Sequence, residues 1–364
     1  MRFPEFSGEW KETTLGKIAE ITKGSGISKD QLSEQGSPCI LYGELYTKYK
    51  SEIINEVYSR TELDSSPLVK SKANDVIIPC SGETAIDIST ARCVLFNNIL
   101  LGGDLNIIRL KYDDGGFFAY QLNGARKKDI ARVAQGVSVV HLYGENLKQI
   151  RVYYPNIEEQ RKITHLLSLI DGRIATQNKI IDKLKSLIKG LAVALTTKGK
   201  PNTAISQCLE CHSSALQESE VIPNGLYKVF GANGLVGYTD VPQMNGDAIL
   251  VIKDGSGVGT VSYAQGKFSV IGTLNYLTVI GNNNLRYLYF ALSVFNFQPY
   301  KTGMAIPHIY FKDYGKAKIY FPPITEQKRV ANVLDKLENK LLLEQGILAS
   351  FNWQKRYLLG QMFI

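Results

Sequence analysis

The chain contains an internal repeat with an offset of 167 residues. Residues 136–143 read Gly-Val-Ser-Val-Val-His-Leu-Tyr, and residues 303–310 read Gly-Met-Ala-Ile-Pro-His-Ile-Tyr. At the same offset, residues 154–163 match residues 321–330, and both segments carry proline at their second position. Because the agreement runs over about 50 residues without a gap, it predicts a duplicated structural unit.

Each copy of the repeat continues into a segment with the pattern of a long helix. After Pro155 and again after Pro322, apolar residues recur with the seven-residue period of a coiled coil. Acidic residues in the first turn suit the helix dipole. The residues expected to pair the helices are Ile163, Ile170, Gln177 and Leu184 in the first and Val330, Leu337, Glu344 and Phe351 in the second.

The polar pair Gln177 and Glu344 falls at the central pairing position of each helix. A polar residue at such a position usually sets the register of a coiled coil. Antiparallel pairing makes the two central layers coincide, so we expect the helices to pair antiparallel. The alternative is two unrelated amphipathic helices on separate domains. About 35 helical residues span roughly 50 Å, about one and a half turns of DNA, so the pair has the dimensions of a spacer between two reading domains.

The segments outside these helices read as globular α/β (α+β) domains. Short β runs punctuated by Gly, Asn and Asp predict a mainly antiparallel, strongly curved sheet in each. The expected strands are residues 75–79, 92–96, 105–110, 248–252, 259–263 and 276–280. The expected short helices are residues 14–22, 117–123 and 285–293. The predicted order is a globular domain at 1–152, a helix at 153–198, a second globular domain at 199–320 and a second helix at 321–364.

The net charge of +8 and the isoelectric point near 9.0 suit an acidic partner such as nucleic acid. Nearly all of the excess positive charge lies in the two helical segments. The solvent-exposed faces of coiled coils can carry such charge without binding nucleic acid. The chain opens without an apolar signal region and has no apolar run approaching ~20 residues. With an odd number of cysteines, this composition leads us to expect a cytoplasmic protein that has no contact with membrane.

The motifs in this layout resemble the specificity subunit of type I restriction–modification systems. The resemblance covers the whole chain. It is carried by Trp10-Lys-Glu-Thr-Thr-Leu-Gly16, Leu41-Tyr-Gly-Glu-Leu-Tyr46, Tyr227-Lys-Val-Phe-Gly-Ala-Asn-Gly234 and the two Pro-x-Ile-x-Glu-Gln helix starts at 155–160 and 322–327.

The resemblance implies that each globular domain is a target recognition domain and that the two read the halves of a bipartite site in double-stranded DNA. The helices would then set the spacer and dock two modification (methyltransferase) subunits. Those subunits would bind S-adenosylmethionine and methylate adenine. Restriction subunits would use ATP and Mg²⁺ for translocation and cleavage, so we expect no cofactor or metal in this chain.

Enzymatic motifs are missing from the sequence, which leads us to expect a non-catalytic subunit. It has neither the Asp/Asn-Pro-Pro-Tyr/Phe motif of amino-methyltransferases nor a Gly-x-x-x-x-Gly-Lys-Ser/Thr loop. Asp335, Glu338 and Lys340 faintly mimic a nuclease motif, but in a helix they point in different directions. A coiled-coil scaffold without sequence-specific DNA binding is the alternative function.

Candidate DNA contacts in the first domain fall in four places along the chain. Aromatic, acceptor and cationic side chains are mixed between Leu41 and Lys50, and glutamate can accept a hydrogen bond from cytosine while lysine contacts guanine or phosphate. A purely structural role for this segment is equally open. The candidates here are Tyr42, Gly43, Glu44, Tyr46, Lys48, Ser81, the basic pair Lys127 and Lys128, and Gln135, Ser138 and His141 in the repeated loop.

The second domain offers corresponding candidates. Glycines at 255–259 can bring backbone N–H groups close to a phosphate, although a β-turn explains them equally well. Asparagine can bond adenine through two contacts. The candidates are Lys228, Asn233, Lys253, Gly255, Ser256, Lys301, Thr302 and His308.

The run Cys208-Leu-Glu-Cys211-His212 matches the spelling of a haem-attachment site. Haem attachment requires export, and zinc requires more ligands than this run supplies. We therefore expect an ordinary helix here.

Overall fold

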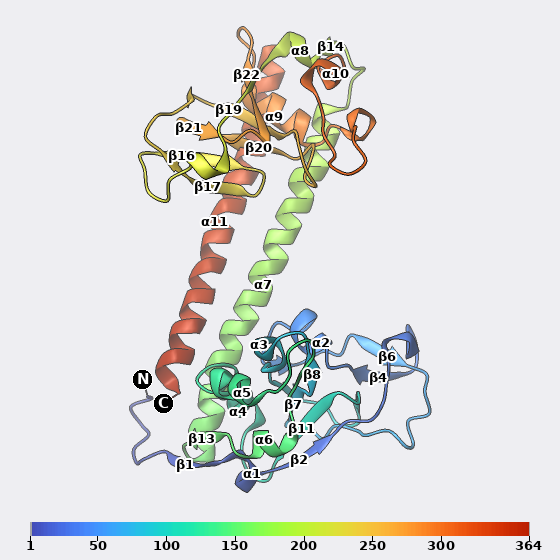
Figure 1. The fold of residues 1–364 in the computed structure, drawn as a ribbon, viewed down its shortest axis with the longest axis vertical. Coiled ribbons are helices and arrows are strands. Elements are labelled where there is room, and N and C mark those ends of the chain that lie inside the picture. Colours follow the sequence, from blue (N-terminus) through green and yellow to red (C-terminus); the bar gives the residue numbers. More distant parts are fainter. Residues whose placement is uncertain (1, 364) are drawn as a thin grey trace. The chain divides into compact units, whose positions relative to one another are not determined.

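The computed structural model describes residues 2–363, which form two compact units. The first unit contains residues up to 178 together with those from 347 onward, and the second contains residues 179–346. Each long helix contributes to both units. These helices are α7 (Ile157–Thr196) and α11 (Ile324–Met362), drawn in green and red in Figure 1. The predicted α/β fold with two long helices is confirmed.

The first unit has two main sheets. A five-stranded sheet has the order β2-β11-β7-β9-β5, a four-stranded sheet has the order β10-β4-β6-β3, and most of their pairings are antiparallel. The strands are β1 (Lys11–Thr14), β2 (Ala19–Lys23), β3 (Leu32–Ser33), β4 (Ser37–Ile40), β5 (Ile53–Ile54), β6 (Ser59–Thr61), β7 (Asp75–Pro79), β8 (Ser81–Gly82), β9 (Arg92–Val94), β10 (Leu100–Leu101), β11 (Leu105–Leu110), β12 (Val140–His141) and β13 (Arg151–Tyr154). The short helices are α1 (Leu15–Ile18), α2 (Glu44–Thr47), α3 (Ala85–Ile88), α4 (Gly115–Asn123), α5 (Lys127–Val133), α6 (Gly144–Lys148) and the 3₁₀ turn η1 (Lys29–Gln31).

The second unit repeats this plan with fewer strands. Its two four-stranded sheets have the orders β15-β22-β19-β20 and β17-β16-β21-β18. The strands are β14 (Thr203–Ala204), β15 (Leu209–Ser213), β16 (Tyr227–Gly231), β17 (Gly234–Thr239), β18 (Met244–Asn245), β19 (Ala248–Ile252), β20 (Val261–Ala264), β21 (Lys267–Val270), β22 (Leu274–Val279) and β23 (Lys318–Ile319). The short helices are α8 (Ile205–Cys208), α9 (Leu285–Ser293), α10 (Phe311–Tyr314) and the 3₁₀ turns η2 (Glu218–Glu220) and η3 (Gln298–Tyr300).

The central strands β7 and β19 have the same place in the two units. Each is buried at all five positions, because it lies in the middle of its sheet and is covered by the short helix α4 or α9. Each pairs antiparallel with the strand before that helix, β11 in the first unit and β22 in the second. The mainly antiparallel character was predicted. The division of each unit into two sheets was not.

The long helices are antiparallel neighbours within each unit. In the first, Lys355 of α11 forms an ion pair with Asp171 of α7 at 2.6 Å, and Arg173 of α7 lies over the ring of Phe351. In the second, Ala192 of α7 shares a buried cluster with residues of the first turns of α11. Early residues of one helix therefore meet late residues of the other. The eight predicted pairing residues, Ile163, Ile170, Gln177, Leu184, Val330, Leu337, Glu344 and Phe351, are all buried or partly buried.

Two expected helices are largely strands. Leu15–Ile18 forms a single turn, and the chain then enters β2, which pairs with β11. In the second unit the turn ends at Cys208, and residues 209–213 form β15, paired with β22. The helix expected across the cysteines is therefore wrong. The physical reason is that a neighbouring strand supplies partners for every backbone group, which overrides weak local preference.

No helix within residues 2–363 is both long enough and apolar enough to cross a membrane.

Candidate nucleic-acid interface

Two matching hairpin loops form the centre of the candidate interface. In the first unit, Gln135 and His141 exchange backbone hydrogen bonds, with N–O distances of 2.9 and 2.7 Å. In the second unit, Thr302 and His308 exchange the same pair at 2.9 and 2.8 Å. We call residues 135–141 and 302–308 the first and second tip hairpins. They lie 167 residues apart, so the sequence repeat is also a repeat in backbone structure.

Each tip hairpin is attached to the end of the central strand of its unit. The N–H of Leu142 donates to the carbonyl of Cys80 at 2.7 Å, and the N–H of Ile309 donates to the carbonyl of Lys253 at 2.9 Å. His141 pairs with Ser81 in the same ladder. Buried strands thus hold both hairpins, and a rigid strand end is a precise place to present contact residues.

In the second unit, most of the predicted contact residues are brought together around its tip hairpin. The N–H of Gly255 donates to the carbonyl of Pro307 at 2.9 Å, which joins the glycine loop to the hairpin. His308 pairs with Asp254, and Lys253 is the residue before it. Gly255 has φ +98°, a conformation that other residues rarely adopt. The grouped candidates are Lys253, Gly255, Ser256, Lys301, Thr302 and His308.

In the first unit, the hairpin lies beside part of the predicted aromatic segment. The Tyr46 hydroxyl lies close to Gly82 of β8, the strand that pairs with the hairpin. Burial, followed by the nearby Tyr42 and acidic side chains, raises the pKa of Tyr46, which keeps its hydroxyl protonated as a hydrogen-bond donor. Tyr46, Ser81, Gln135, Ser138 and His141 therefore belong to one region of this unit.

The Glu44 carboxylate is held by hydrogen bonds within the first unit. It accepts hydrogen bonds from the N–H of Leu41 at 3.0 Å, from Lys48 Nζ at 2.6 Å and from the hydroxyl of Ser59. The side chain is buried. These contacts support the structural alternative for Glu44. The surrounding segment, with Tyr42 and Gly43, lines a cavity of about 1120 Å³.

The two basic residues at the start of α5 differ in exposure. Lys128 is exposed. Lys127 is half-buried with its ammonium 3.3 Å from the hydroxyl of Thr90, and burial, followed by repulsion from Arg92, lowers its pKa. Lys128 is therefore the better placed of the two to contact phosphate.

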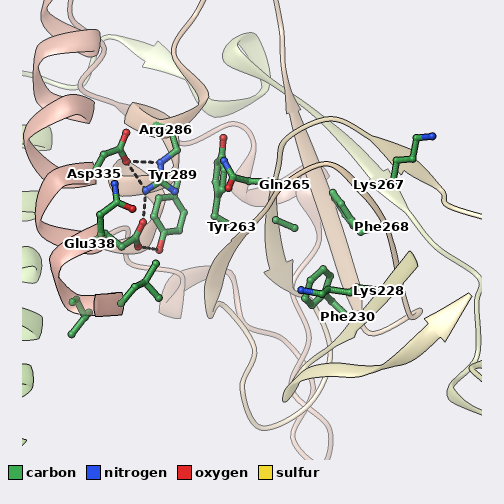
Figure 2. Close-up of a pocket in the computed structure, with 14 residues that line it drawn as sticks. Lys228, Phe230, Tyr263, Gln265, Lys267, Phe268, Arg286, Tyr289, Asp335 and Glu338 are labelled. Carbon is green, nitrogen blue, oxygen red and sulfur yellow. Dashed lines mark hydrogen bonds and ion pairs between the residues drawn. The ribbon is translucent and has the colours of Figure 1, made fainter. Parts of the chain in front are cut away.

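The candidates Lys228 and Asn233 lie apart from the glycine loop, on the other sheet of the second unit. Lys228 is an exposed residue of β16, and Asn233 lies in the turn between β16 and β17. Figure 2 shows Lys228 and Lys267 at a cavity of about 690 Å³ whose opposite wall is α11.

Arg286 lines this cavity next to α11. Its guanidinium donates to Asp335 at 2.6 Å and to Glu338, and it lies 4.4 Å from the ring centre of Tyr263 and 4.8 Å from that of Tyr289 (Figure 2). Burial disfavours the charge, but the hydrogen bonds that Arg286 donates to both carboxylates keep its pKa above the ordinary value. The Asp335 and Glu338 carboxylates therefore both help to hold α9 against α11. The expectation that these two side chains point in different directions is wrong, because residues three apart lie on the same face of a helix.

The Cys208–His212 run has structural contacts. His212 Nε2 is 2.8 Å from the hydroxyl of Thr278, and its ring stacks on Tyr276. Burial raises the pKa of Cys208 and Cys211 to about 11. Among residues 2–363, no cluster of three or more His, Cys, Asp or Glu side chains has the arrangement of a metal site.

The glutamine of the repeated Glu-Gln pair, which has no predicted role, makes the same contact in both units. The side-chain oxygen of Gln160 accepts the N–H of Asp114, the residue that caps α4, at 2.9 Å. The side-chain oxygen of Gln327 accepts the N–H of Asn284, which caps α9, at 3.0 Å. A buried amide therefore fastens each sheet-covering helix to the start of a long helix. The repetition of this glutamine was the signal for such a role.

Comparison with known proteins decides the family. The family model described as the type I restriction modification DNA specificity domain matches residues 7–186 and 210–351. The chain belongs to this family. Specificity subunits are the non-catalytic, DNA-directed members of type I systems, so the predicted class of the chain is confirmed.

The curated relatives are distant. A putative type I specificity subunit of Mycoplasma pneumoniae is 22% identical over 71% of this chain and 68% of its own length. The specificity subunit of the type I restriction enzyme EcoprrI of Escherichia coli is 26% identical over 31% of this chain, and the match spans 28% of that protein.

Solved structures share the fold over the whole chain. The type I restriction–modification S subunit from M. genitalium has a TM-score of 0.72 at 18% identity and covers 100% of this chain and 99% of its own. A chain from a study of complex assembly and conformational transition of the type I system has a TM-score of 0.57 at 13% identity, covering 98% and 97%. The predicted architecture of a specificity subunit is therefore confirmed.

Proposed function

We propose that this chain is the DNA-reading subunit of a type I restriction–modification complex, with one half of a bipartite site read by each globular domain. The domains are residues 1–152 and 199–320. The observation that carries the proposal is the pair of matching tip hairpins, each on a buried strand end in a separate DNA specificity domain. The domains differ in sequence around this common frame, as two readers of different half-sites would.

We assign base and phosphate contact to the residues grouped around the tip hairpins. Lysines and backbone N–H groups suit phosphates, while serine, threonine, histidine and glutamine suit base edges. In the first domain the contact residues beside the hairpin are Tyr46, Ser81, Gln135, Ser138 and His141. The others are Tyr42, Gly43 and Lys48 in the segment where Glu44 binds Lys48, and Lys127 and Lys128 at the start of α5. In the second domain they are Lys253, Gly255, Ser256, Lys301, Thr302 and His308, with Lys228 and Asn233 on its other sheet.

We propose that the long helices set the spacing between the two domains and bind the partner subunits. At 1.5 Å per residue, helices of 40 and 39 residues are each about 60 Å long. In this proposal their exposed faces bind two methyltransferase subunits, which carry S-adenosylmethionine, and restriction subunits add ATP- and Mg²⁺-dependent cleavage. Because the five cysteines are free thiols, we place the complex in the cytoplasm.

The decisive experiment is a domain exchange in the complex assembled with its methyltransferase subunits. Residues 10–150 are replaced by the first domain of another family member, and methylated bases are mapped genome-wide. We expect one half-site to change while the other half-site and the spacer remain. A change in both half-sites would refute the proposal that each domain reads one half-site. If the complex with the original chain methylates no defined sequence, the chain is better explained as a scaffold.

A matched pair of lysine substitutions tests the contact surface. Lys253→Ala is compared with Lys111→Ala, a substitution at an exposed position after β11 to which the proposal assigns no contact. Loss of one phosphate contact reduces the slope of log affinity against log salt by about 0.9. We expect this reduction for Lys253→Ala only. An equal effect of both substitutions would indicate that the slope depends on the total charge of the protein and not on a phosphate contact by Lys253.

A further inference from the structure

The tips of both hairpins carry fully exposed apolar side chains. Val137 is 96% exposed in the first hairpin and Met304 is 105% exposed in the second. Two positions later, Val139 and Ile306 are 53% and 66% exposed. Each tip thus projects two apolar side chains into solvent, at the same two places.

The backbone of each tip holds these side chains outward. Gly136 and Gly303 have positive φ angles of +119° and +85°. A Cβ on Gly136 would collide with the carbonyl of Val139, and one on Gly303 with the carbonyl of Ile306. Only glycine therefore permits this tight turn. The reciprocal hydrogen bonds at the base of each hairpin complete a preformed shape, which lowers the entropy lost on binding.

The two tips differ in sequence but keep the same pattern. The residue between the apolar pair is Ser138 in one hairpin and Ala305 in the other. Exposing an apolar side chain to water is unfavourable compared with burying it. The same unfavourable feature at matching places in two diverged domains indicates an apolar contact that both domains make when bound.

The surroundings of the tips favour DNA over a protein as the partner. A stable protein interface buries about 800 Å² on each partner, whereas each tip offers two side chains on a narrow turn. At its base, the second hairpin has Lys253, Lys301 and the Gly255–Gly259 loop, which suit phosphates. Apolar wedges of this kind, flanked by cations, enter grooves and unstack base steps.

We propose that each tip hairpin inserts its apolar pair, Val137 with Val139 or Met304 with Ile306, against unstacked bases of its own half-site. This inference rests on the proposed function, because it requires that each domain bind one half-site. It adds a DNA-deforming element to each reader and makes the flexibility of one base step part of the recognised sequence.

The test uses the complete complex with its methyltransferase subunits and duplexes carrying 2-aminopurine, whose fluorescence rises when the base unstacks. The recognised sequence is first obtained by methylated-base mapping, and the probe is moved through each half-site, omitting the methylated adenines. The variants are Val137→Ser/Val139→Ser and Met304→Ser/Ile306→Ser. The control is Leu226→Ser, at a residue that is 76% exposed and lies outside both hairpins.

We expect the unaltered complex to raise fluorescence at one step in each half-site. Each double variant should abolish the signal in one half-site only and weaken specific binding about tenfold, equivalent to about 1.4 kcal/mol, while the control changes neither. Unchanged signal and affinity in the variants would overturn the proposal. So would loss of methyltransferase co-purification, which would make the tips protein-docking elements. If the unaltered complex shows no sequence-specific binding, the proposed function itself fails.

Discussion

The side-chain oxygen of Gln327 accepts the backbone N–H of Asn284 at 3.0 Å, while its amide nitrogen donates to the carbonyl of Pro322 at 2.9 Å. Gln160 holds Asp114 in the same way at 2.9 Å. Both glutamines are about 1% exposed. The joint between a long helix and its reading domain is thus built twice from the same buried amide.

Replacing Gln327 with leucine should destabilise the protein by about 2 kcal/mol, since the buried N–H of Asn284 and the carbonyl of Pro322 lose their partner. The free energy of unfolding measured by urea titration checks this. The control is Gln354→Leu, at an exposed position of the same helix. Equal stability of the two variants would show that the amide does not fasten the joint.

Lys355 should be essential for the stability of the first unit. Its ammonium lies 2.5 Å from Glu52 and 2.6 Å from Asp171, and all three side chains are nearly buried. Lys355→Met leaves two carboxylates without their cation, which costs about 3–5 kcal/mol when such a pair is broken. Thermal unfolding should therefore shift strongly downward, whereas Lys336→Met, at an exposed position, should leave the melting temperature unchanged. A shift of similar size in both would contradict the network.

Substitution of Glu44 separates its two possible roles. Because the carboxylate is buried and accepts the Leu41 N–H and Lys48, we expect Glu44→Ala to destabilise the first domain by about 2 kcal/mol. Specific DNA affinity should then fall without a change in the preferred bases, as measured by selection from a randomised half-site. A changed base preference at full stability would instead make Glu44 a base reader.

The cysteine thiols should be unreactive in the folded protein near neutral pH. Burial raises the pKa of Cys39, Cys80 and Cys208 to about 11, so at pH 8 the reactive thiolate is roughly a hundredfold scarcer than in a free thiol. Labelling by Ellman's reagent should be slow at pH 8, accelerate as the pH approaches 11, and be immediate in guanidinium. Rapid labelling of Cys208 together with Cys211 at pH 8 would indicate an accessible thiol pair.

Prediction from sequence succeeded where a hydrophobic pattern continues without a break along one segment of the chain. The seven-residue period after Pro155 and Pro322 is continuous over many turns, so it identified both long helices. The strands predicted at residues 105–110 and 248–252 coincide with β11 and β19, and β19 is apolar throughout because it is buried on both faces. It failed at residues 14–22 and 208–212, where one helical turn passes into a strand whose partner lies more than 60 residues away.

The duplication, the two long helices, their antiparallel pairing and the family could all be predicted from the sequence, because they depend on periodicity and on motifs that are visible along the chain. Which candidate residues lie together on one surface depends instead on contacts in the folded protein. Backbone hydrogen bonds join Gly255 to Pro307 and Leu142 to Cys80, which places His141 opposite Ser81, and Glu44 is enclosed among its own neighbours. Such contacts link distant segments, and they form only after buried strands have fixed the ends of the loops.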